Sequence, residues 1–350
     1  FKEKRMWFVY AVLAGIIWLG YYIRTRNLGH LIDATTGKYI PLALDPFVFL
    51  RYMRYFLENG SLMSIDFMRY YPWGYSAIAE FKVLTYVVVY FYKFLNFFNP
   101  AITLEYVDVI YPVVAFVLSL VVFFFLVRRL FNWKVSLLAT GFLAFAPAYL
   151  YRTMAGFSDK ESLAMLFLFL CLYFFVRFVQ ERKWKDKFVS GSLAGLFLGL
   201  MGLVWGGVNF LFLIIGSFVL VSVFLNKFNE NDFKGYTLLL IVSFATLNIG
   251  YATKYSVVNL FNSTTSGLMV LAWAVALVNF LIFQKDLVGW KGKFKVPSGV
   301  LSLAGVMVLV VIGGVLIFGL DFIVGRLSGV YGQLVNEATS RWILTVAESH

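Results

Sequence analysis

The chain has 350 residues, of which 61% are hydrophobic and 14% are charged, and its mean hydropathy is +0.82. This composition excludes an ordinary soluble protein, because a core of this size cannot bury so much apolar surface, and it predicts a polytopic membrane protein. The net charge of +12 could indicate a nucleic-acid partner, but Lys and Arg cluster in short gaps between apolar runs, as the positive-inside rule describes. We therefore expect an all-α membrane protein that binds no nucleic acid.

Nine apolar runs are long enough to be candidate membrane spans. They lie near residues 7–23, 107–127, 135–150, 161–179, 188–204, 206–225, 237–252, 266–283 and 299–318. A tenth run, 77–98, is rich in Tyr and Phe but contains Glu80, Lys82 and Lys93. The first run follows a basic start and has no small-x-small cleavage site after it, which favours an uncleaved signal anchor.

The positions of Lys and Arg decide whether the run 77–98 spans the membrane. Besides the N-terminal "KEKR", the basic residues gather at 128–134, 181–187, 226–235 and 284–295. If 77–98 does not span, all these clusters lie on one side, as the positive-inside rule requires. We therefore predict nine transmembrane helices with a cytoplasmic N-terminus. A long first outer loop, 24–106, would contain 77–98 as an interfacial or re-entrant helix.

This topology places three groups of acidic residues on the outer face of the membrane. They are Asp33, Asp45 and Asp66 in the first outer loop, Asp159 and Glu161 around the loop 151–160, and Asp321, Glu337 and Glu348 near the end of the chain. Residue chemistry alone does not choose among Asp33, Asp45 and Asp66, or between Glu337 and Glu348.

Asp159 and Glu161 form an acid-x-acid pair at the start of an apolar run. One interpretation is a capped helix start, with Ser158 as N-cap and carboxylates stabilised in the first turn. The other is a divalent cation site, because carboxylate oxygens suit Mg²⁺ or Mn²⁺ and the nearby Arg152 can balance charge or bind a phosphate. A metal site needs further ligands from elsewhere in the chain.

Asp45 and Glu348, two of these acidic residues, each have a plain structural interpretation. Asp45 precedes Pro46, a pair typical of a helix start in which the acid is the N-cap. Glu348 could be a solvated acid near the end of the chain.

Three segments resemble the catalytic subunit of oligosaccharyltransferase in its archaeal form. "LDPFVFLRY" (44–52) is similar to the first acidic motif of that family, "APAYLYRTMAGFSDKES" (146–162) to the second, and "TVAES" (345–349) to its Thr-x-x-Glu motif. "YYPWGYSA" (70–77) resembles the aromatic stretch before an interfacial helix. The order and spacing of these segments fit nearly the whole chain.

The resemblance implies a GT-C-like membrane enzyme that transfers an oligosaccharide from a dolichol phosphate or pyrophosphate donor to the Asn amide of Asn-x-Ser/Thr sequons. It implies Asp45, Glu348 and Arg152 as catalytic residues. It also implies Mn²⁺ or Mg²⁺ held by Asp45, Asp159, Glu161 and Glu348. The expected partners are the lipid-linked donor, an acceptor polypeptide and membrane lipid, with the active site on the outer face of the cell membrane.

The domain organisation follows from the same resemblance. We expect a transmembrane domain over 1–320 and the start of a catalytic outer loop over 321–350. The chain does not begin with Met and stops at "TVAESH". The acceptor-reading Trp-Trp-Asp motif, the final spans and a soluble C-terminal domain are expected in a missing C-terminal part of the same protein.

Two other functions fit the composition. A related glycosyltransferase, similar to a protein O-mannosyltransferase and using a lipid-phosphate sugar, would also place an acid in the first outer loop, and divalent-metal dependence would distinguish it. A transporter would carry charged residues at mid-membrane depth, where this sequence has few.

Overall fold

The computed structural model describes residues 2–290, 293–319, 321, 324–325 and 328. Within these residues the chain is helical, and its β-structure is limited to two isolated bridges, so the predicted all-α class is confirmed. The chain divides into two compact units. The first consists of Phe1–Val219 with Asn229–Trp273, and the second of Leu220–Phe228 with Ala274–His350.

Each of the nine predicted apolar runs contains most of one helix. The helices are α1 (Lys2–Thr25), α4 (Leu104–Leu130), α5 (Trp133–Phe145), α7 (Lys160–Gln180), α8 (Trp184–Val204), α9 (Val208–Phe224), α10 (Glu230–Gly250), α12 (Thr264–Val278) and α13 (Ser298–Phe318). In the described part of the chain, six segments are long and apolar enough to span a membrane, namely Met6–Leu31, α4, α7, α8, α10 and Thr264–Gln284. The apolar helices Trp133–Phe145, Val208–Phe224 and Ser298–Gly313 are shorter, so the count of nine spans stays a prediction.

The run 135–150 is not one continuous helix. Helix α5 ends at Phe145, and a short helix α6 (Pro147–Arg152) begins at Pro147. Proline disfavours helical geometry in the residue before it, and Ala146 accordingly has ψ 121°. This break places Arg152 at the end of α6, just before the loop that leads to Asp159.

Helices α7, α8 and α10 pack closely because small residues line the contact. A Cβ atom added to Gly191 of α8 would lie 2.7 Å from the carbonyl oxygen of Gly235 in α10, and one added to Gly195 would lie 2.4 Å from that of Leu239. Glycine at these positions lets the two backbones approach, as in other membrane helix pairs. Gly191 and Gly195 are therefore helix-packing positions.

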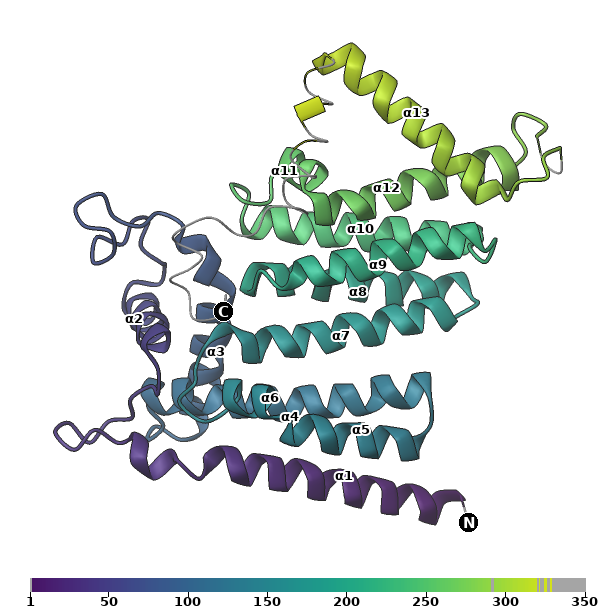
Figure 1. Ribbon diagram of the computed structural model, residues 1–350. Coiled ribbons are helices and arrows are strands. Elements are labelled where there is room, and N and C mark those ends of the chain that lie inside the picture. Colours follow the sequence, from purple (N-terminus) through teal and green to yellow (C-terminus); the bar gives the residue numbers. More distant parts are fainter. Residues whose placement is uncertain (1, 291–292, 320, 322–323, 326–327, 329–350) are drawn as a thin grey trace. The chain divides into compact units, whose positions relative to one another are not determined.

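Helices α2 (Leu44–Asn59) and α3 (Lys82–Phe98) lie at the end of the bundle where α1 ends and α4 begins (Figure 1). Helix α3 buries Leu84, Val88 and Val89 and exposes Tyr90 and Phe94. An amphipathic helix with an exposed aromatic face is typical of a membrane interface, so this arrangement is the one expected for residues 77–98. Its depth in the membrane stays a prediction.

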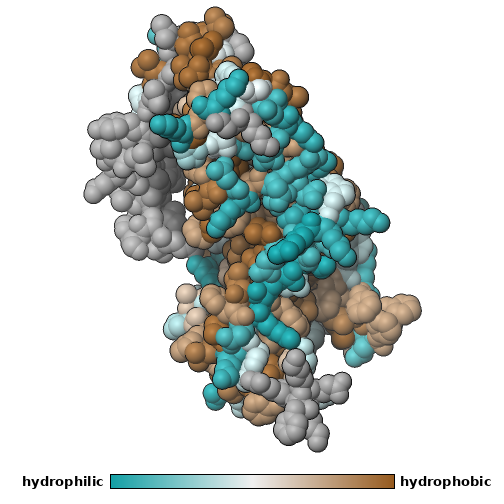
Figure 2. Space-filling model, turned by 90° about the vertical axis from the view of Figure 1, so that its right-hand side faces the viewer, coloured by the Kyte–Doolittle hydropathy of each residue, from teal (hydrophilic) through white to brown (hydrophobic). Residues whose placement is uncertain are grey.

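Two of the predicted basic gaps lie at the opposite end of the bundle. The α4–α5 connection and the α7–α8 connection share this end with the start of α1 (Figure 1). Figure 2 looks onto this end and shows hydrophilic residues gathered across it. The charge argument predicts this placement for 128–134, 181–187 and the N-terminal cluster.

Candidate active site

The candidate site begins at the N-terminus of α7, where Asp159 is the N-cap. Its backbone is extended (φ −93°, ψ 172°), and its carboxylate accepts a hydrogen bond of 2.7 Å from the N–H of Lys160. The prediction that Ser158 is the N-cap was wrong by one residue. Ser158 is fully buried, and its Oγ donates instead to Oδ2 of Asp108 in α4 at 2.9 Å.

The loop before α7 is held by the end of α1. The side chain of Arg24 is fully buried, and its Nε donates to Oγ1 of Thr153 at 2.7 Å. The carbonyl of Arg24 accepts the N–H of Ala155 at 3.0 Å, and Nδ2 of Asn27 donates to the carbonyl of Ala155 at 2.8 Å. Three contacts from α1 and the residues after it therefore fix the position of the loop.

Gly156 joins the same loop to α4 and to the segment before α2. Its N–H donates to the carbonyl of Val109 at 2.8 Å, and its carbonyl accepts the N–H of Leu42 at 2.8 Å. Its φ of +85° favours glycine, and an added Cβ would lie 2.7 Å from Cδ1 of Leu31. The bond to Leu42 brings the start of α2, which carries Asp45, next to the start of α7.

Asp159, Glu161 and Arg152 form a charged group at this point. Asp159 is 5% exposed, and the hydroxyl of Tyr111 donates to its backbone carbonyl. Nη1 of Arg152 lies 3.6 Å from Oε1 of Glu161, within ion-pair distance. Oε2 of Glu161 is buried and has no hydrogen-bond partner in the described part of the chain. A buried carboxylate oxygen without a partner is costly, and it is suited to binding a ligand.

The electrostatics of Asp159 connect it to Asp45. Burial raises the pKa of the Asp159 carboxyl above its ordinary value of 3.8, and the negative charge of Asp45 adds to this effect. The N–H and the ammonium group of Lys160 oppose the rise in pKa. Asp45 itself is exposed in the first turn of α2. The N-cap of α2 is Ala43 and not Asp45 as expected, and helix ends commonly shift by one or two residues.

The other two aspartates of the first outer loop are engaged elsewhere. Asp66 forms an ion pair with Arg51, accepts the hydroxyl of Tyr52 at 2.7 Å and accepts the N–H of Met68 at 3.0 Å. Asp33 caps a turn through Thr35 and Thr36. These contacts give Asp33 and Asp66 structural roles, which sequence reasoning could not separate from that of Asp45.

The predicted metal ligands are only partly brought together. Among the residues that the structure describes, no three His, Cys, Asp or Glu side chains are placed to hold a metal ion. Asp159 and Glu161 are adjacent, Asp45 lies close enough to affect Asp159, and Glu348 lies outside the described residues. The carboxylates and the unpartnered oxygen of Glu161 fit a hard cation such as Mg²⁺ or Mn²⁺.

Sequence reasoning missed two residues of this site. Arg24 closes an apolar run and looked like an ordinary interfacial charge, and Asp108 lies inside a predicted span. An acid within a span is itself a functional signal in membrane proteins, so Asp108 could have been singled out. Nothing in the local sequence shows that Arg24 turns inward.

Parts of this chain are similar in sequence to proteins of known function. The chain is 27% identical over 215 residues to the dolichyl-phosphooligosaccharide-protein glycotransferase of Methanococcus voltae. This alignment covers 57% of this chain and 23% of that protein. It is 26% identical over 179 residues to the STT3 subunit of the dolichyl-diphosphooligosaccharide–protein glycosyltransferase of Saccharomyces cerevisiae, covering 51% of this chain and 24% of that subunit. The alignments thus span about a quarter of these curated relatives.

Solved structures have the same fold. The oligosaccharyltransferase AglB of Archaeoglobus fulgidus, in complex with an inhibitory peptide and a dolichol-phosphate, matches with a TM-score of 0.72 at 20% identity, over 98% of this chain and 40% of that one. The A. fulgidus enzyme in complex with Zn and sulfate matches with a TM-score of 0.65 at 21% identity, over 92% of this chain and 43% of that one. At this identity the likeness shows the fold.

The family model described as "Oligosaccharyl transferase STT3, N-terminal" matches residues 9–347, which is almost the whole chain. The helical bundle, the acidic site at the start of α7 and the relatives agree with this match. The chain therefore belongs to the family of the N-terminal part of the oligosaccharyl transferase STT3.

Proposed function

We propose that the chain forms the N-terminal, membrane-embedded part of an enzyme that transfers an oligosaccharide from a lipid-linked donor to the side-chain amide of Asn in Asn-x-Ser/Thr. The observation that carries this proposal is the pair of buried Asp159 and half-buried Glu161 at the start of α7, near Asp45, in a member of the STT3 family. The donor would be a dolichol phosphate or pyrophosphate. The site would lie on the outer face of the cell membrane, and we keep the nine-span topology with a cytoplasmic N-terminus.

Two A. fulgidus structures support the choice of substrates. One holds a dolichol-phosphate, and another is tethered to an acceptor peptide that contains an NVT sequon, with a TM-score of 0.68 at 19% identity over 89% of this chain and 38% of that one. By analogy, this chain would contact both a lipid phosphate and an acceptor polypeptide. The remaining acceptor-binding part would come from the C-terminal portion of the protein, as the resemblance implies.

The carboxylates would hold a divalent cation, Mn²⁺ or Mg²⁺. Asp45, Asp159, Glu161 and Glu348 would be its ligands, and the complex of the A. fulgidus enzyme with Zn and sulfate supports a cation and an anion in this fold. When bound, such a cation neutralises negative charge that develops on the leaving phosphate. Glu161 contributes a buried oxygen that lacks any other partner among the described residues.

The remaining side chains would bind and orient the substrates. An amide nitrogen is a weak nucleophile, because its lone pair is delocalised into the carbonyl. Asp45 and Glu348 would accept hydrogen bonds from the NH₂ group of the acceptor Asn and so polarise it. Arg152 lies beside Glu161 and would bind a phosphate oxygen, since guanidinium groups suit phosphate geometry. Asp45 is exposed, as contact with an acceptor requires.

A transfer assay with a sequon control tests the proposed function. The protein expressed from its complete gene would be incubated with a lipid-linked oligosaccharide extract and a fluorescent peptide containing Asn-Ala-Thr, and the peptide mass would be followed. The matched control peptide carries Gln-Ala-Thr. We expect a mass gain equal to the oligosaccharide for the Asn peptide alone. A gain on both peptides, or on neither with a verified donor, would contradict the proposal.

A further inference from the structure

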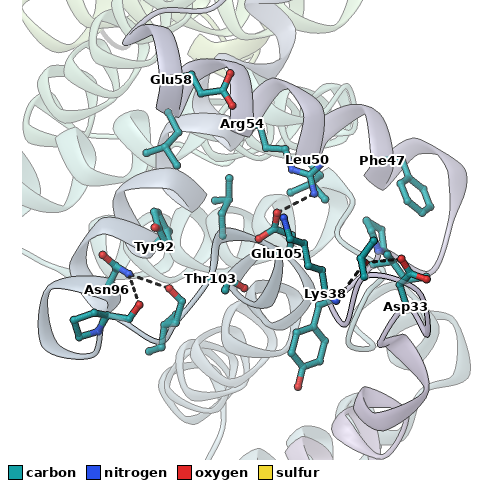
Figure 3. A pocket seen from close by; sticks show the side chains of 18 residues that line it. Asp33, Lys38, Phe47, Leu50, Arg54, Glu58, Tyr92, Asn96, Thr103 and Glu105 are labelled. Atoms are coloured by element: carbon teal, nitrogen blue, oxygen red, sulfur yellow. Dashed lines mark hydrogen bonds and ion pairs between the residues drawn. The ribbon is translucent and has the colours of Figure 1, made fainter.

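A cavity of about 790 Å³ opens beside α2. Its walls come from the 33–41 segment, one face of α2, the end of α3 and the start of α4 (Figure 3). Its volume lies within the range of small-molecule sites, about 300–1,000 Å³. Asp45, Asp159 and Glu161 are not among its lining residues, so the proposed transfer reaction leaves this cavity without a role.

The cavity presents three kinds of group to a ligand. Carboxylates provide acceptors, a lysine and an arginine provide donors, and aromatic rings provide flat apolar surfaces. These are Asp33, Glu58 and Glu105; Lys38 and Arg54; and Phe47, Tyr39 and Tyr92. The side-chain NH₂ group of Asn96, which also lines the cavity, donates to the carbonyls of Pro100 and Ile102. Small-molecule sites are usually lined mostly by apolar side chains with a few polar groups, so this mixture selects for a polar ligand.

Several polar groups of the cavity remain available for a ligand. Nη2 of Arg54 in α2 pairs with Oε1 of Glu105 in α4 at 2.9 Å, which connects two walls of the cavity. Lys38 and Glu58 are exposed, and neither forms an ion pair with any described residue. Figure 3 shows Lys38 reaching toward Glu105, with Glu58 further along α2. The donor Lys38 and the acceptor Glu58 thus lie on either side of the ion pair between Arg54 and Glu105.

The charges of the cavity disfavour an anion. Three carboxylates face two cationic side chains, which leaves a formal charge of −1. A neutral ligand rich in hydroxyl groups fits better, because each hydroxyl both donates and accepts hydrogen bonds. Aromatic rings have a negative face that attracts the slightly positive C–H groups on the apolar face of a sugar ring. Phe47 is 47% exposed, so its ring is accessible for such a contact. This combination is the chemistry of carbohydrate recognition.

The cavity is placed along the helix that carries Asp45. Phe47, Arg54 and Glu58 follow at near-helical spacing and share one face of α2. From Asp45 to Glu58 the helix rises by about 20 Å at 1.5 Å per residue. Asp45 lies on roughly the opposite face of α2 from these three residues. An oligosaccharide whose first sugar lies at Asp45 would therefore enter the cavity by passing around the first turn of α2, where Leu44 is 86% exposed.

We propose that this cavity binds the sugars of the donor oligosaccharide that are remote from the transferred end. The proposal rests on the function proposed above, because it assumes that the first sugar lies at the acidic site. It predicts that the enzyme distinguishes a complete oligosaccharide from a single sugar through residues that do not take part in the transfer itself.

The test compares two donors in the protein expressed from its complete gene. One donor carries the complete oligosaccharide and the other carries only its first sugar on the same lipid. We expect Lys38→Ala and Glu58→Gln each to raise KM for the complete donor about tenfold, while kcat/KM for the single-sugar donor stays within twofold. Lys93→Ala is the matched control, because Lys93 is an exposed lysine of α3 outside the cavity, and it should change neither value.

Other outcomes would overturn the assignment. Equal losses with both donors would mean that Lys38 and Glu58 affect the fold or the reaction centre. A change only in KM for the peptide would assign the cavity to the acceptor. No change with either donor would show that the cavity does not bind the donor sugars.

Direct binding keeps this inference separate from the proposed function. If the wild-type protein transfers from neither donor, the proposed function fails. The cavity is then tested by titrating free oligosaccharide, released from the donor by mild acid, into the purified wild-type protein and the Lys38→Ala variant. Binding that weakens about tenfold in the variant would support the cavity, and equal binding or no binding would overturn it.

Discussion

Asp159 combines two roles that are normally separate. Its carboxylate caps α7 through the N–H of Lys160, yet it is buried beside Glu161 and near Asp45, which raises its pKa. Capping alone would need no burial and no acidic neighbours, and Asn would serve as well. The concentration of carboxylates therefore costs stability in the absence of a cation. Such a cost is common where function requires charges to be close.

The substitution Asp159→Asn should stabilise the cation-free protein. Because the folded pKa of Asp159 lies above the unfolded value, its ionised form destabilises the fold once the pH has risen through both values. Asn keeps the cap and removes the charge. In EDTA at pH 7.5 we expect the melting temperature to rise by roughly 2 °C or more.

Added Mn²⁺ separates this account from simple capping. It should raise the melting temperature of the wild type and leave Asp159→Asn unchanged. If Asp159 were only a cap, Asp159→Asn would be neutral in EDTA and both proteins would respond alike to Mn²⁺.

The contribution of Asp66 to the stability of the fold depends on pH in the opposite direction to that of Asp159. Burial would raise its pKa, but hydrogen bonds from Tyr52, Arg51 and the N–H of Met68 outweigh burial and lower the pKa below 3.8. Its contribution is thus present above about pH 4 and is lost as the pH falls through the lower, folded value. Asp66→Asn should cost about 2 kcal/mol at pH 7, since bonds to a charged group are lost.

Melting curves of the wild type and Asp66→Asn from pH 7 to pH 3 would check this dependence. The two melting temperatures should converge below about pH 4. A constant difference over this range would show that Asp66 acts through packing and not through its charge.

At the scale of elements, a buried ion pair joins the ends of α7, α8 and α10. Nζ of Lys187 in α8 lies 2.5 Å from Oδ1 of Asp232 in α10 and donates to the carbonyl of Phe178 in α7 at 2.8 Å. Both side chains of the pair are largely buried. Removing one partner would leave a buried charge without compensation, which is the expensive case for ion pairs.

Lys187→Met should therefore destabilise the protein by about 3–5 kcal/mol. The matched control is Lys234→Gln, two residues after Asp232 in α10, where the ion pair with Glu230 is half exposed and should be worth about 0.5 kcal/mol. Thermal unfolding in detergent compares the two variants. Similar losses for both would show that burial of the Lys187 pair does not matter.

At the scale of the whole molecule, the fold places the acidic site and the basic connections at opposite ends of the first unit. Residues 151–160 and α2 lie at one end, and the α4–α5 and α7–α8 connections lie at the other (Figure 1). If the first end faces outward, the positive-inside rule is satisfied.

Cysteine labelling tests this orientation. The only native thiol, Cys171, is buried and would first be replaced by Ala. In intact cells, a membrane-impermeant maleimide should label Lys38→Cys of the first outer loop and should label Lys185→Cys, in the basic connection 181–187, only after permeabilisation. The reverse pattern would contradict the predicted topology.

The sequence predicts the helices of this protein better than it predicts the contacts between distant side chains. Hydropathy located every helix of the nine apolar runs, because spanning length and composition are local properties. The break before Pro147 is also readable from the chain, yet the predicted run crossed it. The N-cap of α7 was misplaced because Ser158 is drawn to Asp108, a residue 50 positions away. Arg24 and Asp66 likewise owe their roles to distant partners, which no local pattern contains.

The most direct test of the account is metal-dependent transfer by the wild type and by Asp159→Asn, both expressed from the complete gene. Transfer to an Asn-Ala-Thr peptide would be followed with Mn²⁺ and with EDTA, and the melting temperatures would confirm that both proteins are folded. We predict that EDTA abolishes wild-type transfer, that Mn²⁺ restores it, and that Asp159→Asn loses at least a hundredfold in rate, about 2.7 kcal/mol, while remaining folded. Wild-type transfer indifferent to EDTA, or near-normal transfer by Asp159→Asn, would contradict the account.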